Sequence, residues 1–244
     1  MSPPEIDQEV VLYWNRDECP YFPGRERVTH FFFAPTLLPL LYETLISRGF
    51  RRSGYTFYQH HCPGCQDCLP IRVDIRRLTL STSQRRVLRK NRDVTILRHP
   101  NAFKPEDFLL YRAYCAQRHP SSPVPDEESY RDFLIASPLT TEIMRYYVQD
   151  RLVGLGWIDL LPHSLSSVYF SFDPEYSSRS LGTFSVLQQA ALCARLGKEW
   201  LHLGFWVKER QNMAYKSRFK PCQILIDGTW RELDSTPNFP ACLA

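Results

Sequence analysis

The order of predicted elements between residues 142 and 207 constrains the fold of this chain more than any other feature. Alternation of apolar with polar or small residues predicts strands at 142–149, 152–160 and 167–172, and an apolar run predicts a buried strand at 199–207. A long apolar helix is predicted at 186–196, between the last two strands. An antiparallel hairpin, a third strand, a helix and a further strand predict an α+β domain.

The loop before that helix has the sequence Arg179-Ser180-Leu181-Gly182-Thr183. A glycine loop between a strand and a helix presents backbone N–H groups and the helix dipole to an anion or a carbonyl oxygen. The loop resembles the acyl-donor loop of the GNAT acyltransferases, and an ordinary strand-to-helix turn is the alternative. The strand at 199–207 and the segment 212–221 resemble the next GNAT segment, where splayed strands admit the acyl donor.

Residues 1–100 differ in character from residues 101–244, and we place a boundary near Pro100. In the first part, apolar residues at helical spacing predict a helix that ends at Gly49. Strands are predicted at 54–58 and 71–75, with a group of cysteines in the loop between them. We therefore expect a small N-terminal, basic, cysteine-bearing subdomain at 1–100, packed against a GNAT-like acyltransferase domain at 101–244.

Three cysteines in that loop, Cys62, Cys65 and Cys68, have the spacing C-x2-C-x2-C, which lets three thiolates converge on one ion. Cys19 or His61 could supply a fourth ligand, and zinc and an iron–sulfur cluster both fit this donor set. Unmetallated cysteines in a loop are the alternative. The sequence has eight cysteines and no signal-peptide pattern, so reduced thiols are expected rather than disulfides.

A basic run covers residues 76–98, although the net charge of the whole chain is only +4. Eight lysines and arginines lie in this run, against a single acid, Asp93. Hydroxyl side chains at 81–83, followed by good helix formers, predict a short basic helix. Such a run is typical of a site for a polyanion, and a solvated helix face is the alternative.

Five motifs, in order along the chain, are similar to those of the arginyl-tRNA-protein transferase family, and most of all to its bacterial leucyltransferase branch. They are Cys19-Pro20-Tyr21-Phe22-Pro23-Gly24-Arg25, Gly49-Phe50-Arg51-Arg52-Ser53-Gly54, Cys62-Pro63-Gly64-Cys65-Gln66-Asp67-Cys68-Leu69-Pro70-Ile71-Arg72-Val73, Ser83-Gln84-Arg85-Arg86 and Ser180-Leu181-Gly182-Thr183-Phe184-Ser185. One position departs from the pattern, because Phe22 stands where a second cysteine would complete a pair with Cys19.

The resemblance implies an aminoacyl transfer reaction of the N-degron pathway. Leucine, held as an ester on the 3′ end of a tRNA, is attacked by the free α-amine of a protein that begins with Asp or Glu. Because the ester is already activated, transfer needs no metal or cofactor. The resemblance also implies that the basic run binds tRNA. The residues expected to contact the tRNA are Arg85, Arg86, Arg89, Lys90 and Arg92. It marks Cys19, Cys62, Cys65 and Cys68 as an iron–sulfur or redox-sensing site.

Candidate catalytic residues lie near the predicted strand ends and helix start, where the ester is expected. These general acid/base or positioning candidates are Tyr169, Asp173, Tyr215 and Lys216. Recognition of an acidic acceptor side chain requires a fixed cation, and the candidates are Arg72, Arg76 and Arg179.

Two alternatives to leucyl transfer remain open at this point. Arginine could be the donor, because donor choice depends on the shape of a pocket. A non-catalytic RNA-binding or metal-sensing protein could also retain the fold. The sequence has neither an export signal nor an apolar stretch long enough to cross a membrane, so we expect a cytoplasmic protein without membrane contact.

Overall fold

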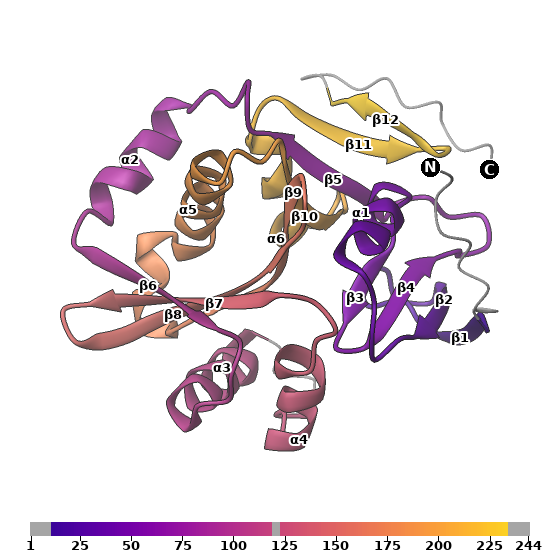
Figure 1. Cartoon of the computed structure of the whole chain (residues 1–244), viewed down its shortest axis with the longest axis horizontal. Helices are drawn as coiled ribbons and strands as arrows, with labels where there is room; N and C mark the ends of the chain where they lie inside the picture. Colours follow the sequence, from indigo (N-terminus) through magenta and orange to yellow (C-terminus); the bar gives the residue numbers. More distant parts are fainter. Residues whose placement is uncertain (1–10, 119–122, 234–244) are drawn as a thin grey trace.

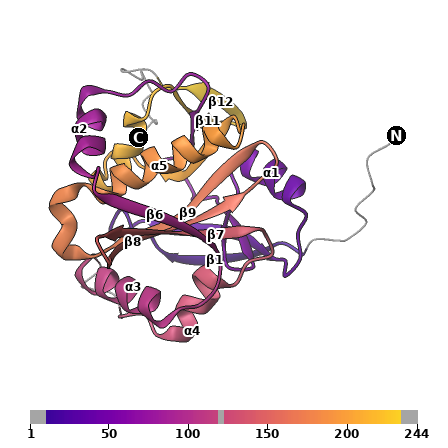
Figure 2. The ribbon, with the colours of Figure 1, turned by 60° about the vertical axis from the view of Figure 1, so that its left-hand side comes forward.

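Two β-sheets organise the chain (Figure 1). The computed structural model describes residues 11–118 and 123–233. A four-stranded sheet lies near the N-terminus, and an eight-stranded sheet takes its strands from residues 69 to 232. Helices cover both faces of the larger sheet (Figures 1 and 2). The expected α+β fold is confirmed.

The four-stranded sheet has the order β1-β2-β4-β3, and its neighbouring strands are antiparallel. Its strands are β1 (Tyr13–Glu18), β2 (Glu26–Phe33), β3 (Arg51–Ser53) and β4 (Thr56–His60). Helix α1 (Pro39–Ser47) packs Tyr42 edge-on against Phe57, and both side chains are fully buried. The predicted helix end is confirmed, because Gly49 has φ +94 and its N–H bonds to the carbonyl of Ile46.

The eight-stranded sheet has the order β12-β11-β5-β10-β9-β8-β7-β6. Its strands are β5 (Leu69–Asp74), β6 (Val94–Pro100), β7 (Thr141–Val148), β8 (Arg151–Leu160), β9 (Ser164–Phe172), β10 (Trp200–Trp206), β11 (Cys222–Ile226) and β12 (Thr229–Glu232). Neighbouring strands are antiparallel except β9 and β10, which are parallel. Helix α5 (Leu181–Arg195) connects these two strands, so the predicted order of strand, helix and strand is confirmed.

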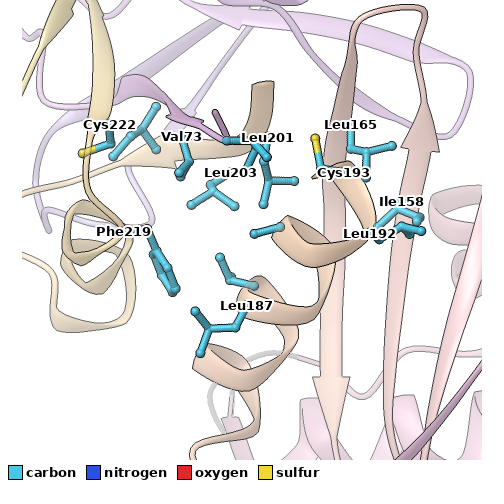
Figure 3. Close-up of a cluster of buried hydrophobic side chains, with 14 of the residues drawn as sticks. Val73, Ile158, Leu165, Leu187, Leu192, Cys193, Leu201, Leu203, Phe219 and Cys222 are labelled. Carbon is cyan, nitrogen blue, oxygen red and sulfur yellow. The ribbon is translucent and has the colours of Figure 1, made fainter. Parts of the chain in front are cut away.

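Helices α5 and α2 (Thr82–Lys90) lie on one face of the large sheet, and α3 (Pro105–Arg118) and α4 (Glu127–Tyr130) lie on the other (Figure 2). Helix α5 is apolar because it is buried: Leu187, Leu192 and Cys193 pack against side chains of the sheet (Figure 3). The remaining helical segments are η1 (Arg131–Ile135), η2 (Pro174–Arg179), α6 (Gln211–Ala214) and η3 (Tyr215–Arg218). None of the described helices is long and apolar enough to cross a membrane.

The division between the two sheets does not fall at residue 100. Strands β5 and β6 precede that residue but belong to the large sheet, where β5 pairs with β10 and β11, and β6 pairs with β7. The small sheet and α1 therefore occupy residues 13–60. The cysteine loop connects β4 to β5, so it runs from one sheet to the other.

Helix α2 begins as its sequence predicts. The Ser81 hydroxyl accepts a hydrogen bond from the backbone N–H of Gln84, and the Gln84 side-chain oxygen accepts one from the N–H of Ser81. This reciprocal capping box satisfies two N–H groups that a helix start leaves without partners. The Gln84 amide also donates to the carbonyl of Arg218 at 3.0 Å, which fixes α2 against the C-terminal part of the chain.

Candidate active site at a fork between two strands

Strands β9 and β10 pair over only part of their length. In the described residues, parallel pairing joins 200–202 to 164–166 and goes no further, whereas β9 continues along β8 and β10 continues along β5. Pairing changes at a bulge in β10, where Gly204 adopts φ +81, a conformation that favours glycine. We call the diverging residues, 166–167 on β9 and 203–205 on β10, the strand fork. It is the splayed arrangement that the GNAT resemblance implies.

Arg51 of β3 brings a guanidinium group from the small sheet to the strand fork. The residue is only 7% exposed. Its Nη1 donates to Ser166 Oγ at 3.2 Å, and its Nη2 donates to the Ser167 carbonyl at 2.5 Å. The guanidinium lies beside Gly204: a Cβ atom added to this glycine would be 3.5 Å from Nε and 3.5 Å from Nη2. Arg51 thus binds β9 at the last residue paired with β10 and at the residue that follows it.

Lys216 reaches the strand fork from the side of β10. Its Nζ donates a hydrogen bond to the carbonyl of Phe205 at 2.7 Å. Burial of the ammonium group, followed by repulsion from Arg51, lowers the pKa of Lys216 from 10.5 to about 7. Much of Lys216 is therefore neutral near pH 7. A neutral amine that donates to Phe205 keeps a lone pair with which it can accept a proton.

Two predicted tyrosines share Tyr114 of α3 as a neighbour. The rings of Tyr169 and Tyr114 meet edge to face, with centroids 6.4 Å apart, and burial raises the pKa of Tyr169. Burial, followed by the effect of Tyr114, raises the pKa of Tyr215 to about 12. Both hydroxyls stay protonated near neutral pH. They can therefore donate hydrogen bonds but cannot act as bases.

The fourth predicted catalytic residue, Asp173, has partners away from the strand fork. It follows β9, and its carboxylate accepts hydrogen bonds from Arg151 Nη2 at 2.6 Å and from the Glu175 N–H at 3.0 Å. The second bond caps the start of η2. None of the bonds found among the described residues joins Asp173 to the strand fork.

Arg72, one of the arginines predicted to recognise an acidic side chain, lies between two tryptophans. Its guanidinium carbon is 3.7 Å from the ring centre of Trp200 and 4.2 Å from that of Trp230. It also donates two hydrogen bonds to Gln223 Oε1. Burial lowers the pKa of Arg72 to about 10. These contacts hold β5, β10, β11 and β12 together on one face of the sheet.

The other two arginines predicted for this role are paired with acids on the surface. Arg76 pairs with Glu199. Arg179 holds Asp93 through two hydrogen bonds of 2.7 and 3.0 Å, and this pair lowers the pKa of Asp93. The structure therefore brings none of the three predicted arginines to the strand fork.

The predicted tRNA-binding helix and the predicted acyl-donor loop lie side by side (Figure 2). Lys90 Nζ donates to the Ser178 carbonyl at 2.6 Å, and Asn91 Nδ2 donates to the Arg179 carbonyl at 2.9 Å. The five cations predicted to contact tRNA are exposed, and none forms an ion pair within 4 Å in the described residues. These cations are Arg85, Arg86, Arg89, Lys90 and Arg92. They form an unpaired basic face next to the loop.

The loop itself forms the start of α5. Ser180 adopts φ +56 and makes no side-chain cap to the helix. Leu181 is buried, whereas the space where a Cβ of Gly182 would lie is open. Uncapped N–H groups in the first turn of a 15-residue helix suit an anion or a carbonyl oxygen.

The four cysteines predicted as metal ligands, Cys19, Cys62, Cys65 and Cys68, line one cavity beside the small sheet. Burial, followed by the three neighbouring thiols, raises the pKa of Cys68 to about 12. The Cys65 thiol points to Asp67 Oδ2 at 3.4 Å. In this arrangement no three Cys, His, Asp or Glu side chains of the described residues are placed to hold one metal ion.

His61, the alternative fourth ligand, stacks on His30 with ring centres 4.3 Å apart. Its Nε2 lies 3.1 Å from the side-chain oxygen of Gln59. Burial, followed by His30, lowers the pKa of His61. Cys19 shares one cavity with the three loop cysteines, and His61 lines a second cavity together with the same three.

Arg51 is a site residue that the sequence patterns do not predict. Arg51 and Arg52 are adjacent in β3, so their side chains face opposite sides, but the sequence does not show which partner lies on each side. Arg52 pairs with Asp159, 107 residues further along the chain, whereas Arg51 reaches the strand fork. Only the positions of distant strands distinguish the two side chains.

Comparisons with known proteins point to one family. The family model described as arginine-tRNA-protein transferase, N terminus, matches residues 17–86, and the model for the C terminus matches residues 106–226. A protein named aspartate/glutamate leucyltransferase from Aeromonas hydrophila is 39% identical over 199 residues, 81% of this chain and 83% of the relative. A protein of the same name from Thiobacillus denitrificans is 38% identical over 232 residues, 93% of this chain and 97% of the relative.

The strand fork, the uncapped start of α5 and the order of strands form the arrangement expected of a GNAT-like fold. The solved structure of FemX has a TM-score of 0.48 and 8% identity, over 70% of this chain and 61% of that one. With relatives at 38–39% identity over most of its length, the chain belongs to the arginine-tRNA-protein transferase family and is a transferase.

Proposed function

We propose that this protein transfers leucine from leucyl-tRNA to the N-terminus of proteins that begin with aspartate or glutamate. Relatives that carry this activity in their names support the proposal. In the structure, the observation that carries it is the strand fork: Lys216 can accept a proton there, and Arg51 supplies a fixed positive charge. The reaction requires charged tRNA, so we expect the protein to work in the cytoplasm.

The proposed reaction moves one proton and exchanges one bond. The acceptor α-amine attacks the carbonyl carbon of the leucyl ester, a C–N bond forms, and the C–O bond to the ribose breaks. Neutral Lys216 accepts the proton that the amine loses and returns it to the departing ribose oxygen. The protonated hydroxyl of Tyr215, the neighbour of Lys216 in η3, is the neutral donor that we assign to stabilise negative charge on the carbonyl oxygen, whereas Tyr169 interacts with Cys115 of α3.

The charges at the strand fork favour leucine over arginine as the donor. Arg51 is a cation, and neither Arg51 nor Lys216 forms an ion pair with a carboxylate within 4 Å in the described part of the chain. Tyr114 and Tyr169 add aromatic surface nearby. An arginyl side chain would meet like charge without a carboxylate to bind, whereas a leucyl side chain would not.

The exposed face of α2 is the proposed tRNA contact, and it predicts a salt effect. Changing Arg85 and Arg89 to Gln should lower tRNA affinity and reduce the slope of log K against log salt by about 0.7–0.9 per lost phosphate contact. Filter binding from low to moderate salt measures this slope. Arg112→Gln on α3, which lies on the opposite face of the sheet, is the matched control and should keep the wild-type slope (Figure 2). Unchanged slopes in the α2 variant would contradict the assignment.

We also propose that Cys19, Cys62, Cys65 and Cys68 hold zinc or an iron–sulfur cluster in a labile or substoichiometric form. Their common cavity supports this, because four thiols in one place form a strong donor set once rotated inward and deprotonated. A bound metal would supply a cross-link between β1, the cysteine loop and β5. It takes no part in the transfer step.

Anaerobic purification with metal analysis and visible absorption tests this site. Wild-type protein should retain measurable metal, and Cys68→Ser should lose nearly all of it because a ligand is removed. Cys115→Ser changes a buried thiol in a different cluster and should keep the wild-type metal content. Wild-type protein that is colourless, metal-free and fully active would refute the proposal.

Transfer of radiolabelled amino acid to an Asp-leading peptide tests the function itself. Purified protein should move label from leucyl-tRNA and not from arginyl-tRNA. Transfer from arginyl-tRNA would identify arginine as the donor instead. If neither donor is used although the protein binds tRNA, the chain is a binding or sensing relative rather than an enzyme.

A further inference from the structure

Three arginines are buried in the part of the chain that the structure describes, and Arg51 differs from the other two because it has no carboxylate partner. Arg52 binds Asp159 through two nitrogens, and Arg145 binds Asp107 in the same way. Arg51 forms no ion pair among these residues and bonds only to neutral oxygens of β9. It is therefore a buried cation without a counter-charge.

A buried charge is unfavourable unless an opposite charge or several hydrogen bonds offset the lost hydration. The neighbouring side chains do little to stabilise the positive charge of Arg51. Repulsion from Arg51 is one of the causes that lower the pKa of Lys216, so this neighbour offers no negative charge. His202, also close, is kept neutral because burial, and then Arg72 and Arg51, lower its pKa well below the usual range. The surroundings of Arg51 thus suit an anion that arrives from outside the described chain.

The guanidinium group still has N–H groups to offer. A guanidinium carries five N–H donors, and Arg51 uses two of its nitrogens on Ser166 and Ser167. Three N–H groups remain, one on each nitrogen, and a pair of them can bind a carboxylate through two parallel hydrogen bonds, which is the preferred geometry between arginine and a carboxylate. A Cβ at position 204 would lie 3.5 Å from Nε and Nη2, so the glycine leaves the space beside these nitrogens free of a side chain.

We propose that Arg51 binds the side-chain carboxylate of the acceptor's N-terminal Asp or Glu and so determines which proteins are modified. This role rests on the proposed transfer function. In such an acceptor the side-chain carboxylate and the α-amine are only a few carbon atoms apart. Arg51 and Lys216 meet at the same strand fork, so one holds the carboxylate while the other accepts the proton of the amine.

This arrangement also explains why the acceptor site needs both sheets. Arg51 comes from β3 of the small sheet, and Lys216 comes from η3, beyond β10 of the large sheet. The small sheet therefore supplies selectivity, and the large sheet supplies the donor loop and the proton acceptor. None of the arginines predicted from sequence is placed at the fork in this way.

The test compares acceptors that differ only in charge. Rates of leucyl transfer from preformed leucyl-tRNA are measured with Asp-leading and Asn-leading peptides for wild type, Arg51→Gln and Arg51→Lys. Arg51→Gln should lower the Asp/Asn ratio of kcat/KM at least about thirtyfold, because a buried charge pair is lost. Arg51→Lys keeps the charge but not the paired hydrogen bonds, so its ratio should lie between those of the other two. Arg76→Gln, on the surface, should leave the ratio unchanged.

A direct binding measurement separates this proposal from the transfer function. Calorimetry without tRNA should show that wild type prefers the Asp-leading peptide and that Arg51→Gln does not. Wild type that binds with this preference but transfers no leucine would refute the transfer function and leave the role of Arg51 intact. A folded Arg51→Gln or Arg51→Lys variant that keeps the wild-type Asp/Asn ratio would overturn the proposal. So would weaker tRNA binding with an unchanged ratio, because Arg51 would then serve the donor.

Discussion

Replacing Lys216 with Met should reduce the rate of leucyl transfer by about 10²–10⁴-fold, the usual contribution of a positioned general base. Methionine fills a similar volume but cannot accept the proton of the acceptor amine. Lys216→Arg is the matched control for charge: it can still donate to the Phe205 carbonyl, but it stays protonated and should be as inactive. Single-turnover rates at saturating tRNA and peptide measure both variants.

The same substitution should not destabilise the protein, which distinguishes catalysis from packing. The pKa of Lys216 lies near 7 in the folded protein and near 10.5 when unfolded. The unfolded chain therefore binds more protons between these values, and wild-type stability should rise as pH increases from 7 towards 10. Lys216→Met should remove this rise and match or exceed wild-type stability at pH 7. A Lys216→Met variant that is less stable than wild type but keeps its transfer rate would contradict the assignment of Lys216 as the proton acceptor.

The pH dependence of transfer gives a second check on Lys216. The rate should increase with pH up to about 7 as Lys216 loses its proton. In Lys216→Met this increase should disappear, leaving only the titration of the acceptor amine, which lies near pH 8. An identical pH profile in variant and wild type would show that another group accepts the proton.

Replacing Asp159 with Asn should lower the free energy of unfolding by about 3–5 kcal/mol, because it leaves the Arg52 guanidinium buried without its counter-charge. Both side chains are at most 1% exposed. Asp159 Oδ1 also accepts from the Thr141 hydroxyl at 2.7 Å, so the carboxylate connects β3 to β7 and β8. Urea denaturation followed by circular dichroism measures the loss.

A double variant controls for this pair. Arg52→Met with Asp159→Asn removes both charges and should recover part of the stability lost by Asp159→Asn alone. Arg27 and Asp17 form a pair on the surface, and Asp17→Asn should change stability by less than about 1 kcal/mol. A loss in Asp159→Asn as small as in Asp17→Asn would show that the buried pair does not hold the two sheets together.

Local patterns predicted the elements that carry the donor side of the site. The hydroxyl residues before α2, the glycine at the end of α1 and the apolar run of α5 each depend on neighbours within one or two helical turns. The structure confirms these elements, and it places Lys216 beside the strand fork. Sequence reasoning sufficed there because the signals are short-range.

The acceptor side of the site depends on contacts between distant residues. Arg51 acquires its role because β3 lies across β9, 115 residues away, and Arg72 is occupied by Trp200 and Trp230 from two other strands. The sequence predicts a domain boundary near residue 100, whereas the small sheet already ends at residue 60. The difference arises because β5 has no local feature that shows its pairing with β10 and β11. Strand pairing depends on contacts between residues far apart in the chain, and local patterns in a single sequence do not show these contacts.

A competition between two donors decides whether this protein is a leucyl transferase that acts on acidic N-termini. One reaction contains purified protein, an Asp-leading peptide and equal amounts of leucyl-tRNA and arginyl-tRNA, and mass spectrometry identifies the product. A peptide extended by one leucine at its N-terminus, with no such product from an Asn-leading peptide, is the predicted result. A peptide extended by arginine, or no extension from either donor, would contradict it.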